Sequence, residues 1–93
     1  MRVGVCVIRF EVAESASLKD KRQVVRSVKD RARQRFNISI AEVGDLESRT
    51  TAELGIACVS NDSRHLDRLL NHVANYIEDE FPLSVLHVEF EIL

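Results

Sequence analysis

The sequence has little of what marks disordered, secreted or membrane-spanning chains. Its 93 residues include one proline and three glycines, with no low-complexity run, so the composition excludes a disordered chain. No stretch approaches the roughly 18 consecutive apolar residues of a membrane span, and residues 1–8 are too short and strand-like for a secretory signal. With 45% apolar residues, we expect one globular domain, residues 1–93, in the cytoplasm.

Cysteine and histidine are also scarce, which limits the chemistry open to the chain. Cys6 and Cys58 form no CxxC pair, so neither a disulfide framework nor a zinc ribbon is indicated, and we predict that both are buried and reduced. His65 and His72 lie roughly 10 Å apart along one predicted helix and cannot share a metal ion without other ligands. Since no nucleophile has a base predicted in reach, we expect a non-enzymatic protein without cofactor or metal.

Apolar periodicity predicts six elements in the order βαββαβ. The predicted strands cover residues 2–13, 38–46, 50–60 and 84–93. The first helix follows Ser17, its predicted N-cap, and stops at Asn37; the second follows the capping residues 60–62 and ends before Pro82. Two right-handed crossovers joined by a hairpin predict an α+β, ferredoxin-like sandwich, with an antiparallel four-stranded sheet in the order 4-1-3-2 and both helices on one face.

Alternation along each strand assigns its residues to the inner or outer face of the sheet. The predicted inward residues are Gly4, Cys6, Ile8, Phe10 and Val12 in the first strand, Ala52, Leu54, Ile56 and Cys58 in the third, and Leu86, Val88, Phe90 and Ile92 in the last. The outer face then carries an apolar patch, which favours a homodimer interface. The predicted interface residues are Val3, Val5, Val7, Val59 and Val85. Aromatic residues for stacking RNA bases are absent from the outward positions of the first and third strands.

Charge is segregated along the chain. Residues 19–35 hold eight basic residues against two acids, a net charge of +6, and since the whole chain carries −2, the other 76 residues carry −8. Cations crowd the first turn of this helix, where its dipole disfavours each by about 0.3–1 kcal/mol, so an anionic partner is indicated. The predicted anion- or RNA-binding residues are Ser17, Lys19, Lys21, Arg22, Arg26, Lys29 and Arg33. The alternative is an ordinary solvated helix whose Lys21 or Arg22 is neutralised by Glu11 or Glu14.

Three segments of the chain resemble the YlxP-like family, a bacterial domain family of unknown function. They are SLKDKRQVVRSV (17–28), RFNISIAEVGD (35–45) and LGIACVSND (54–62), and the resemblance runs from residue 3 to about residue 80. Genes of this family often lie among genes for transcription elongation, translation initiation and ribosome maturation, so the resemblance implies a role near RNA or the ribosome. Many relatives have Trp-Gln where this chain has Arg49-Thr50, so a role of that tryptophan does not carry over.

These observations lead to two functional hypotheses. The first is a non-enzymatic RNA- or ribosome-associated protein that binds through its basic first helix. The second is a protein-interaction or dimerisation module that acts through the open sheet face, without nucleic acid.

Overall fold

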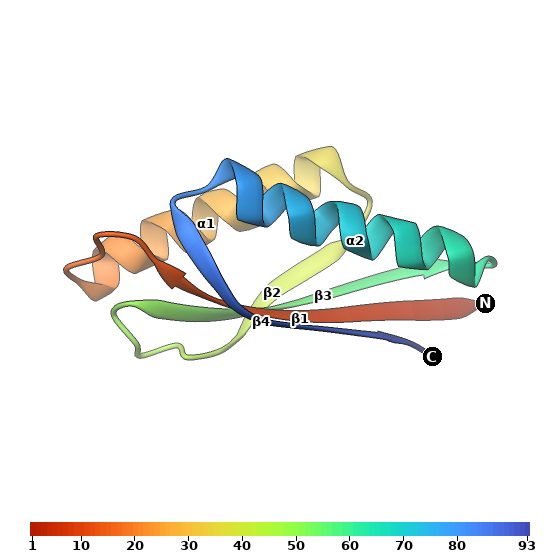
Figure 1. The fold of residues 1–93 in the computed structure, drawn as a ribbon, viewed down its shortest axis with the longest axis horizontal. Helices are drawn as coiled ribbons and strands as arrows, with labels where there is room; N and C mark the ends of the chain where they lie inside the picture. Colours follow the sequence, from red (N-terminus) through yellow and green to blue (C-terminus); the bar gives the residue numbers. More distant parts are fainter.

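The computed structural model describes residues 1–93 and contains six elements in the predicted order (Figure 1). The strands are β1 (Arg2–Val12), β2 (Ser39–Gly44), β3 (Thr51–Ser60) and β4 (Leu83–Ile92), and the helices are α1 (Leu18–Arg35) and α2 (Ser63–Glu80). Neither helix combines the length and the apolar character that a membrane crossing requires.

The four strands form one antiparallel sheet in the order β2-β3-β1-β4, which is the predicted order read from the other edge. The central strands are β1 and β3, as predicted, and both helices cover the same face (Figure 1). The two chain termini lie at one end of the sheet. The β1–α1 loop and the β2–β3 hairpin lie together at the other end (Figure 1).

The core lies between the sheet and the two helices, and it confirms the predicted inward faces of β1 and β3. Residues at alternating positions from Gly4 to Val12 and from Ala52 to Cys58 are all buried. The helices cover them with Val25, Val28 and Ala32 of α1 and with Leu66, Leu70, Val73 and Ile77 of α2. Helix α2 begins where the Asp62 carboxylate accepts the N–H of Arg64 at 2.9 Å and ends before Pro82, as predicted.

Strand β4 departs from the predicted alternation. The pairing with β1 shifts between Arg9 and Phe10, so Val85 lies opposite Phe10 and packs against the core, whereas Leu86 is 50% exposed. One extra residue in a strand reverses the faces of the residues on one side of it relative to those on the other, and here residues 83–85 are the reversed ones. The prediction that Leu86 faces inward and Val85 outward was therefore wrong. Val88 and Ile92, on the C-terminal side of the shift, keep the predicted face and pack against the core.

Candidate anion-binding surface

The cations of α1 gather along one side of the helix. They follow one another at intervals of three and four residues, which places them on a single stripe about 21 Å long. We call this stripe the basic flank: Lys19, Arg22, Arg26, Lys29 and Arg33. The guanidinium of Arg33 donates to the carbonyl oxygen of Ile40 at 2.8 Å, so the stripe runs beside the edge strand β2 rather than on top of the helical layer.

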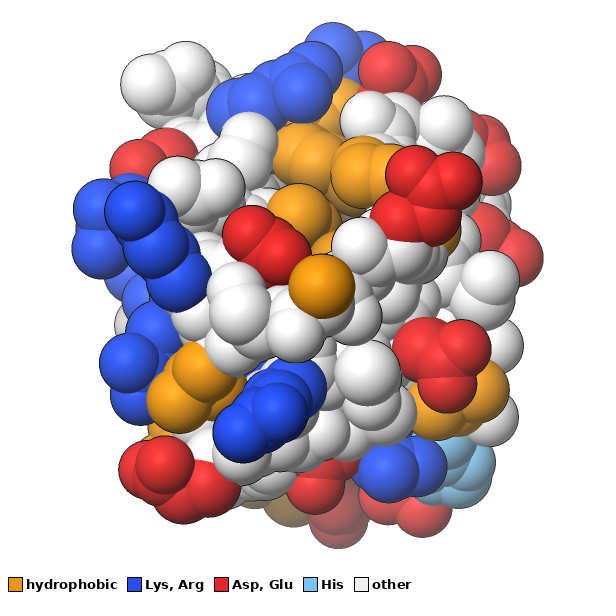
Figure 2. Space-filling model, turned by 90° about the vertical axis from the view of Figure 1, so that its left-hand side faces the viewer, with side chains coloured by type: hydrophobic (Ala, Val, Ile, Leu, Met, Phe, Trp, Pro, Cys, Tyr) orange, Lys and Arg blue, Asp and Glu red, His pale blue; other side chains and the backbone are white.

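Four of the five cations in the basic flank have no ion-pair partner within the chain. Only Arg33 is paired, with Asp30 at 3.5 Å, and both of these side chains are about half exposed. The alternative hypothesis required Glu11 or Glu14 to neutralise Lys21 or Arg22. Neither acid pairs with either cation, although Lys21 is paired within the chain with Glu42. Figure 2 shows Lys and Arg side chains along its left side, where α1 lies, and acidic side chains mainly on the right. Apart from Arg33, the basic flank is thus a surface of cations without ion-pair partners.

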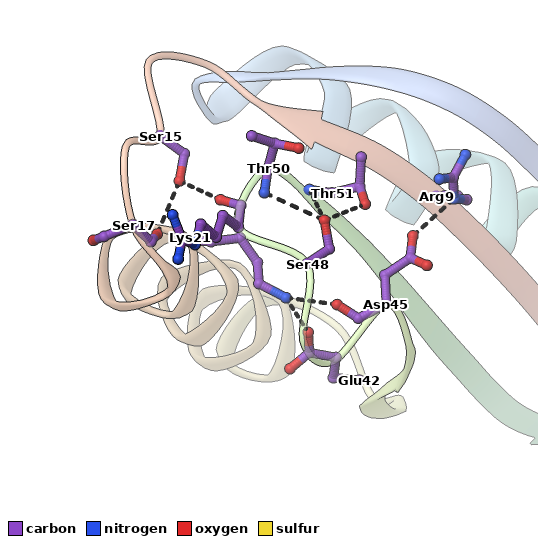
Figure 3. A network of polar contacts seen from close by, with 10 residues as sticks. Arg9, Ser15, Ser17, Lys21, Glu42, Asp45, Ser48, Thr50 and Thr51 are labelled. Atoms are coloured by element: carbon purple, nitrogen blue, oxygen red, sulfur yellow. Dashed lines mark hydrogen bonds and ion pairs between the residues drawn. The ribbon is translucent and has the colours of Figure 1, made fainter.

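Lys21 lies inside the molecule and does not belong to this surface, contrary to the prediction from the sequence. Its side chain is 0% exposed, with Nζ 3.0 Å from a carboxylate oxygen of Glu42 and 2.9 Å from the carbonyl oxygen of Asp45 (Figure 3). The physical reason is helical spacing, because residue 21 shares a helix face with the buried Val25 and Val28. The charge of Lys21 is satisfied within the chain, so it is not free to bind an anion.

The amino-terminal end of α1 is also satisfied within the chain. The Ser17 hydroxyl accepts the N–H of Asp20 at 3.1 Å, and the Asp20 carboxylate accepts the N–H of Ala16 at 3.2 Å. Ser17 is thus the predicted N-cap, and Asp20 places a negative charge at the positive end of the helix dipole. Because the cap occupies this end, Ser17 is not a ligand for an external anion, and the candidate surface is limited to the basic flank.

Hydrogen bonds tie the β1–α1 loop to the β2–β3 hairpin beside this end (Figure 3). The Ser15 hydroxyl donates to the carbonyl oxygen of Arg49 at 2.6 Å. Inside the hairpin, the Ser48 hydroxyl accepts the N–H of Thr51 at 3.0 Å. These bonds, together with the contacts of Lys21, hold the start of α1 against the hairpin.

An ion pair between β1 and the hairpin completes this network. Nε of Arg9 lies 2.8 Å from a carboxylate oxygen of Asp45, a residue with a positive φ of 56° (Figure 3). The hydrogen bond from Arg9 lowers the pKa of the Asp45 carboxyl below its ordinary value of 3.8. Arg9 is therefore bound to the hairpin and does not extend the basic flank.

The sequence analysis missed Glu42 and Asp45 as the partners of buried or half-buried cations. A signal for Glu42 was present, because it alternates with Ile40 and so shares the inward face of β2. An acid on the inward face of a strand requires a partner, and Lys21 occupies the matching inward position on α1. No comparable signal pointed to Asp45, since its role depends on the conformation of the hairpin.

The outer face of the sheet carries the other predicted site. Val3, Val5 and Val7 of β1 lie half-buried there, and Val59 of β3 is 63% exposed, in agreement with the predicted face. Val85 is not part of this face, because the register shift in β4 turns it into the core. Four of the five predicted interface residues therefore lie on the outer face.

The two cysteines are free and lie in the core, as predicted. Burial raises the pKa of the Cys6 thiol to about 11, with a further contribution from Cys58, and burial likewise raises the pKa of Cys58. Buried thiols that resist ionisation are poor nucleophiles. No group of three or more His, Cys, Asp or Glu side chains is placed to hold a metal ion.

Comparison with known proteins agrees with the resemblance noted in the sequence. Residues 3–90 match a family described as "Protein of unknown function (DUF503)". The chain is also 34% identical over 80 residues to the uncharacterized protein YlxP of Bacillus subtilis (strain 168), an alignment that covers 86% of each chain.

Proposed function

Because the chain belongs to the DUF503 family of proteins of unknown function, we propose a function from its surface: a non-enzymatic protein that binds the phosphates of RNA through the basic flank of α1. The observation that carries the proposal is the stripe of five cations, four of them without a carboxylate partner. Phosphate contacts by Lys and Arg supply most of the affinity of non-specific nucleic-acid binding.

The shape of the basic flank favours an extended anion over a small one. Neighbouring cations on the stripe have Cβ atoms about 5–6 Å apart, and the whole stripe runs about 21 Å along α1. A free phosphate ion would engage one or two of these side chains, whereas a nucleic-acid backbone would engage all of them. The hydrogen bond from Arg33 to Ile40 holds that end of the stripe beside β2, so part of its geometry is fixed before binding.

Structured RNA fits the surface better than single strands whose bases stack on protein. The central outward positions of the sheet hold Val5, Val7 and Ala57, which offer no aromatic platform for bases. Recognition through phosphates and helix shape is the usual way in which proteins bind double-stranded RNA. The ligand that we propose is therefore ribosomal or other folded RNA in the cytoplasm.

The assignment of the chain to a fold family is part of the same proposal. With two helices over one face of a sheet in the order 4-1-3-2, we assign residues 1–93 to a single ferredoxin-like sandwich. Because this fold hosts many unrelated functions, it adds nothing to the choice of ligand.

Charge reversal on the basic flank tests the proposed function. The variant Arg22→Glu with Arg26→Glu should bind a fluorescently labelled RNA hairpin roughly tenfold or more weakly than the wild type at low salt, because two phosphate contacts become repulsions. The matched control is Arg64→Glu with Arg68→Glu, which makes the same change in net charge at the same spacing on the exposed side of α2. The control should keep most of the wild-type affinity.

Two results would overturn the proposal. One is equal binding by the wild type and the flank variant, which would make the basic flank a solvated helix surface. The other is an equal loss in the flank variant and the α2 control, which would mean that affinity follows net charge alone. Circular dichroism of each variant checks that its helices are intact.

A further inference from the structure

The outer face of the sheet has a ridge beside a hollow. Along β1 the ridge consists of Val3, Val5 and Val7, whereas the paired positions of β3 are Val59, Ala57 and Gly55. The hollow has a volume of about 280 Å³, with small residues of β2 and β3 in its lining and Val43 at its far side. A Cβ added to Gly55 would lie only 3.0 Å from a methyl carbon of Val43, so Val43 leans against this glycine.

The ridge of one copy fits the hollow of a second copy when a two-fold axis parallel to the strands relates the two. If a two-fold axis runs between β1 and β3, β1 of one copy lies over β3 of the other. Val5 then faces Ala57, and Val7 faces Gly55 beside Val43, so two of the three ridge valines meet a small residue, whereas Val3 meets Val59. If the axis is instead perpendicular to the strands, each valine ridge lies on the other valine ridge and the hollows stay empty.

The charges on the face select the same axis. Residues paired across the four strands form a row from β2 to β4, and one such row is Ser39, Ala57, Val5 and Glu91. In the next outward-facing row, Glu89 of β4 pairs with Val7 of β1. The parallel axis places Glu91 over Ser39 of the other copy, at the edge beside which the basic flank runs. The perpendicular axis places the acidic edge of β4 over itself, and like charges in a buried contact are unfavourable.

The face is also large enough for a stable contact. Strands β1, β3 and β4 have 11, 10 and 10 residues and β2 has 6, so at about 4.8 Å between strands and roughly 3.3 Å per residue the face spans about 600 Å². Specific interfaces begin at about 600 Å² per partner. The outer face is opposite the helices, so a copy bound there leaves the basic flank accessible (Figure 1).

From this complementarity we propose that a second copy of the chain covers the outer face, in a two-fold dimer whose axis runs parallel to the strands between β1 and β3. The valine ridge of each copy fills the hollow of the other. This dimer is independent of RNA binding, because it uses the opposite side of the sheet.

Cross-linking between two single variants tests the axis. A mixture of Ser39→Cys and Glu91→Cys chains, treated with a short bifunctional maleimide, should form covalent dimers, because these two positions face each other across the interface. Each variant alone should form few, and the wild type none, since Cys6 and Cys58 are buried. Efficient cross-linking of Glu91→Cys alone would establish the perpendicular axis and overturn the proposal, as would a mixture that does not cross-link.

Sedimentation equilibrium tests the dimer itself. The wild type should have twice the chain mass of 10.6 kDa at tens of micromolar. Val5→Asp should be a monomer, and so should Val59→Asp, a more exposed position in the same patch that folding tolerates better. Leu46→Asp, which alters another exposed apolar residue, in the hairpin, should remain a dimer. A monomeric wild type, or a dimer that survives both valine substitutions, would overturn the proposal.

Discussion

At the scale of single residues, the buried lysine of α1 connects three elements of the fold. Lys21 is fully enclosed, and its ammonium group bridges Glu42 and the Asp45 carbonyl oxygen, so it joins α1, β2 and the hairpin. Removing one partner of a buried ion pair leaves the other charge uncompensated, whereas replacing both by apolar residues is often nearly neutral. The pair therefore fixes the start of α1, which carries the basic flank, against β2 and the hairpin, and the desolvation of the two charges opposes this stabilisation.

This role predicts the effect of mutating the pair. Lys21→Met should lower the free energy of unfolding by about 3 kcal/mol in urea denaturation, because the Glu42 carboxylate remains with 15% exposure and no cation. Adding Glu42→Leu should restore most of the loss. Lys19→Met, two residues away and exposed, should change stability by less than about 0.5 kcal/mol. A Lys21→Met variant as stable as the Lys19 control would contradict the buried pair.

The ion pair between Arg9 and Asp45 predicts a pH dependence of stability. Because the folded state lowers the pKa of Asp45, this carboxylate stabilises the protein above its unfolded pKa near 3.8, and the contribution is lost as the pH falls below that value. Arg9→Gln should therefore be less stable than the wild type at about pH 6, with a difference that shrinks toward about pH 2. Arg2→Gln, on the same strand without an ion-pair partner, is the control. A difference between Arg9→Gln and the wild type that is independent of pH would contradict the assignment.

At the scale of elements, the register shift in β4 places two adjacent residues in different environments. Val85 packs against the core, whereas Leu86 is half exposed. Val85→Ala should lower the free energy of unfolding by about 1–2 kcal/mol, and Leu86→Ala by less than about 0.5 kcal/mol. Uninterrupted alternation would produce the opposite ranking, so urea denaturation of the two variants decides between them.

The same strand shows where prediction from the sequence stops. The order of elements, the inward faces of β1 and β3 and the cap at Ser17 follow from local periodicity and capping chemistry, and all were predicted. The shift opposite Arg9 and Phe10 depends on how β4 pairs with β1 over a long separation in sequence, and no residue pattern marks it. The burial of Lys21 could have been inferred from its helical spacing to Val25 and Val28, but its charge led to its wrong assignment to the anion-binding residues.

At the scale of the whole molecule, the sheet separates two surfaces of different character. The helices lie on one side of the sheet (Figure 1). This layer carries the basic flank beside β2, and the outer face carries the valine ridge and the acidic edge of β4. The net charge of −2 is therefore the sum of a positive first helix and a negative charge on the rest of the chain. The proposed dimer would carry two basic flanks, one on each copy, at opposite edges of the paired sheets.

The salt dependence of RNA binding tests the central claim most directly. If the basic flank contacts phosphates, the logarithm of the association constant should fall linearly with the logarithm of salt concentration, with a slope of about −0.7 to −0.9 for each contact. For one RNA hairpin, Arg22→Gln with Arg26→Gln should make this slope shallower by about two contacts, and Arg64→Gln with Arg68→Gln should leave it as in the wild type. A wild-type protein that does not bind the hairpin at low salt, or a slope that the flank substitutions leave unchanged, would contradict the account.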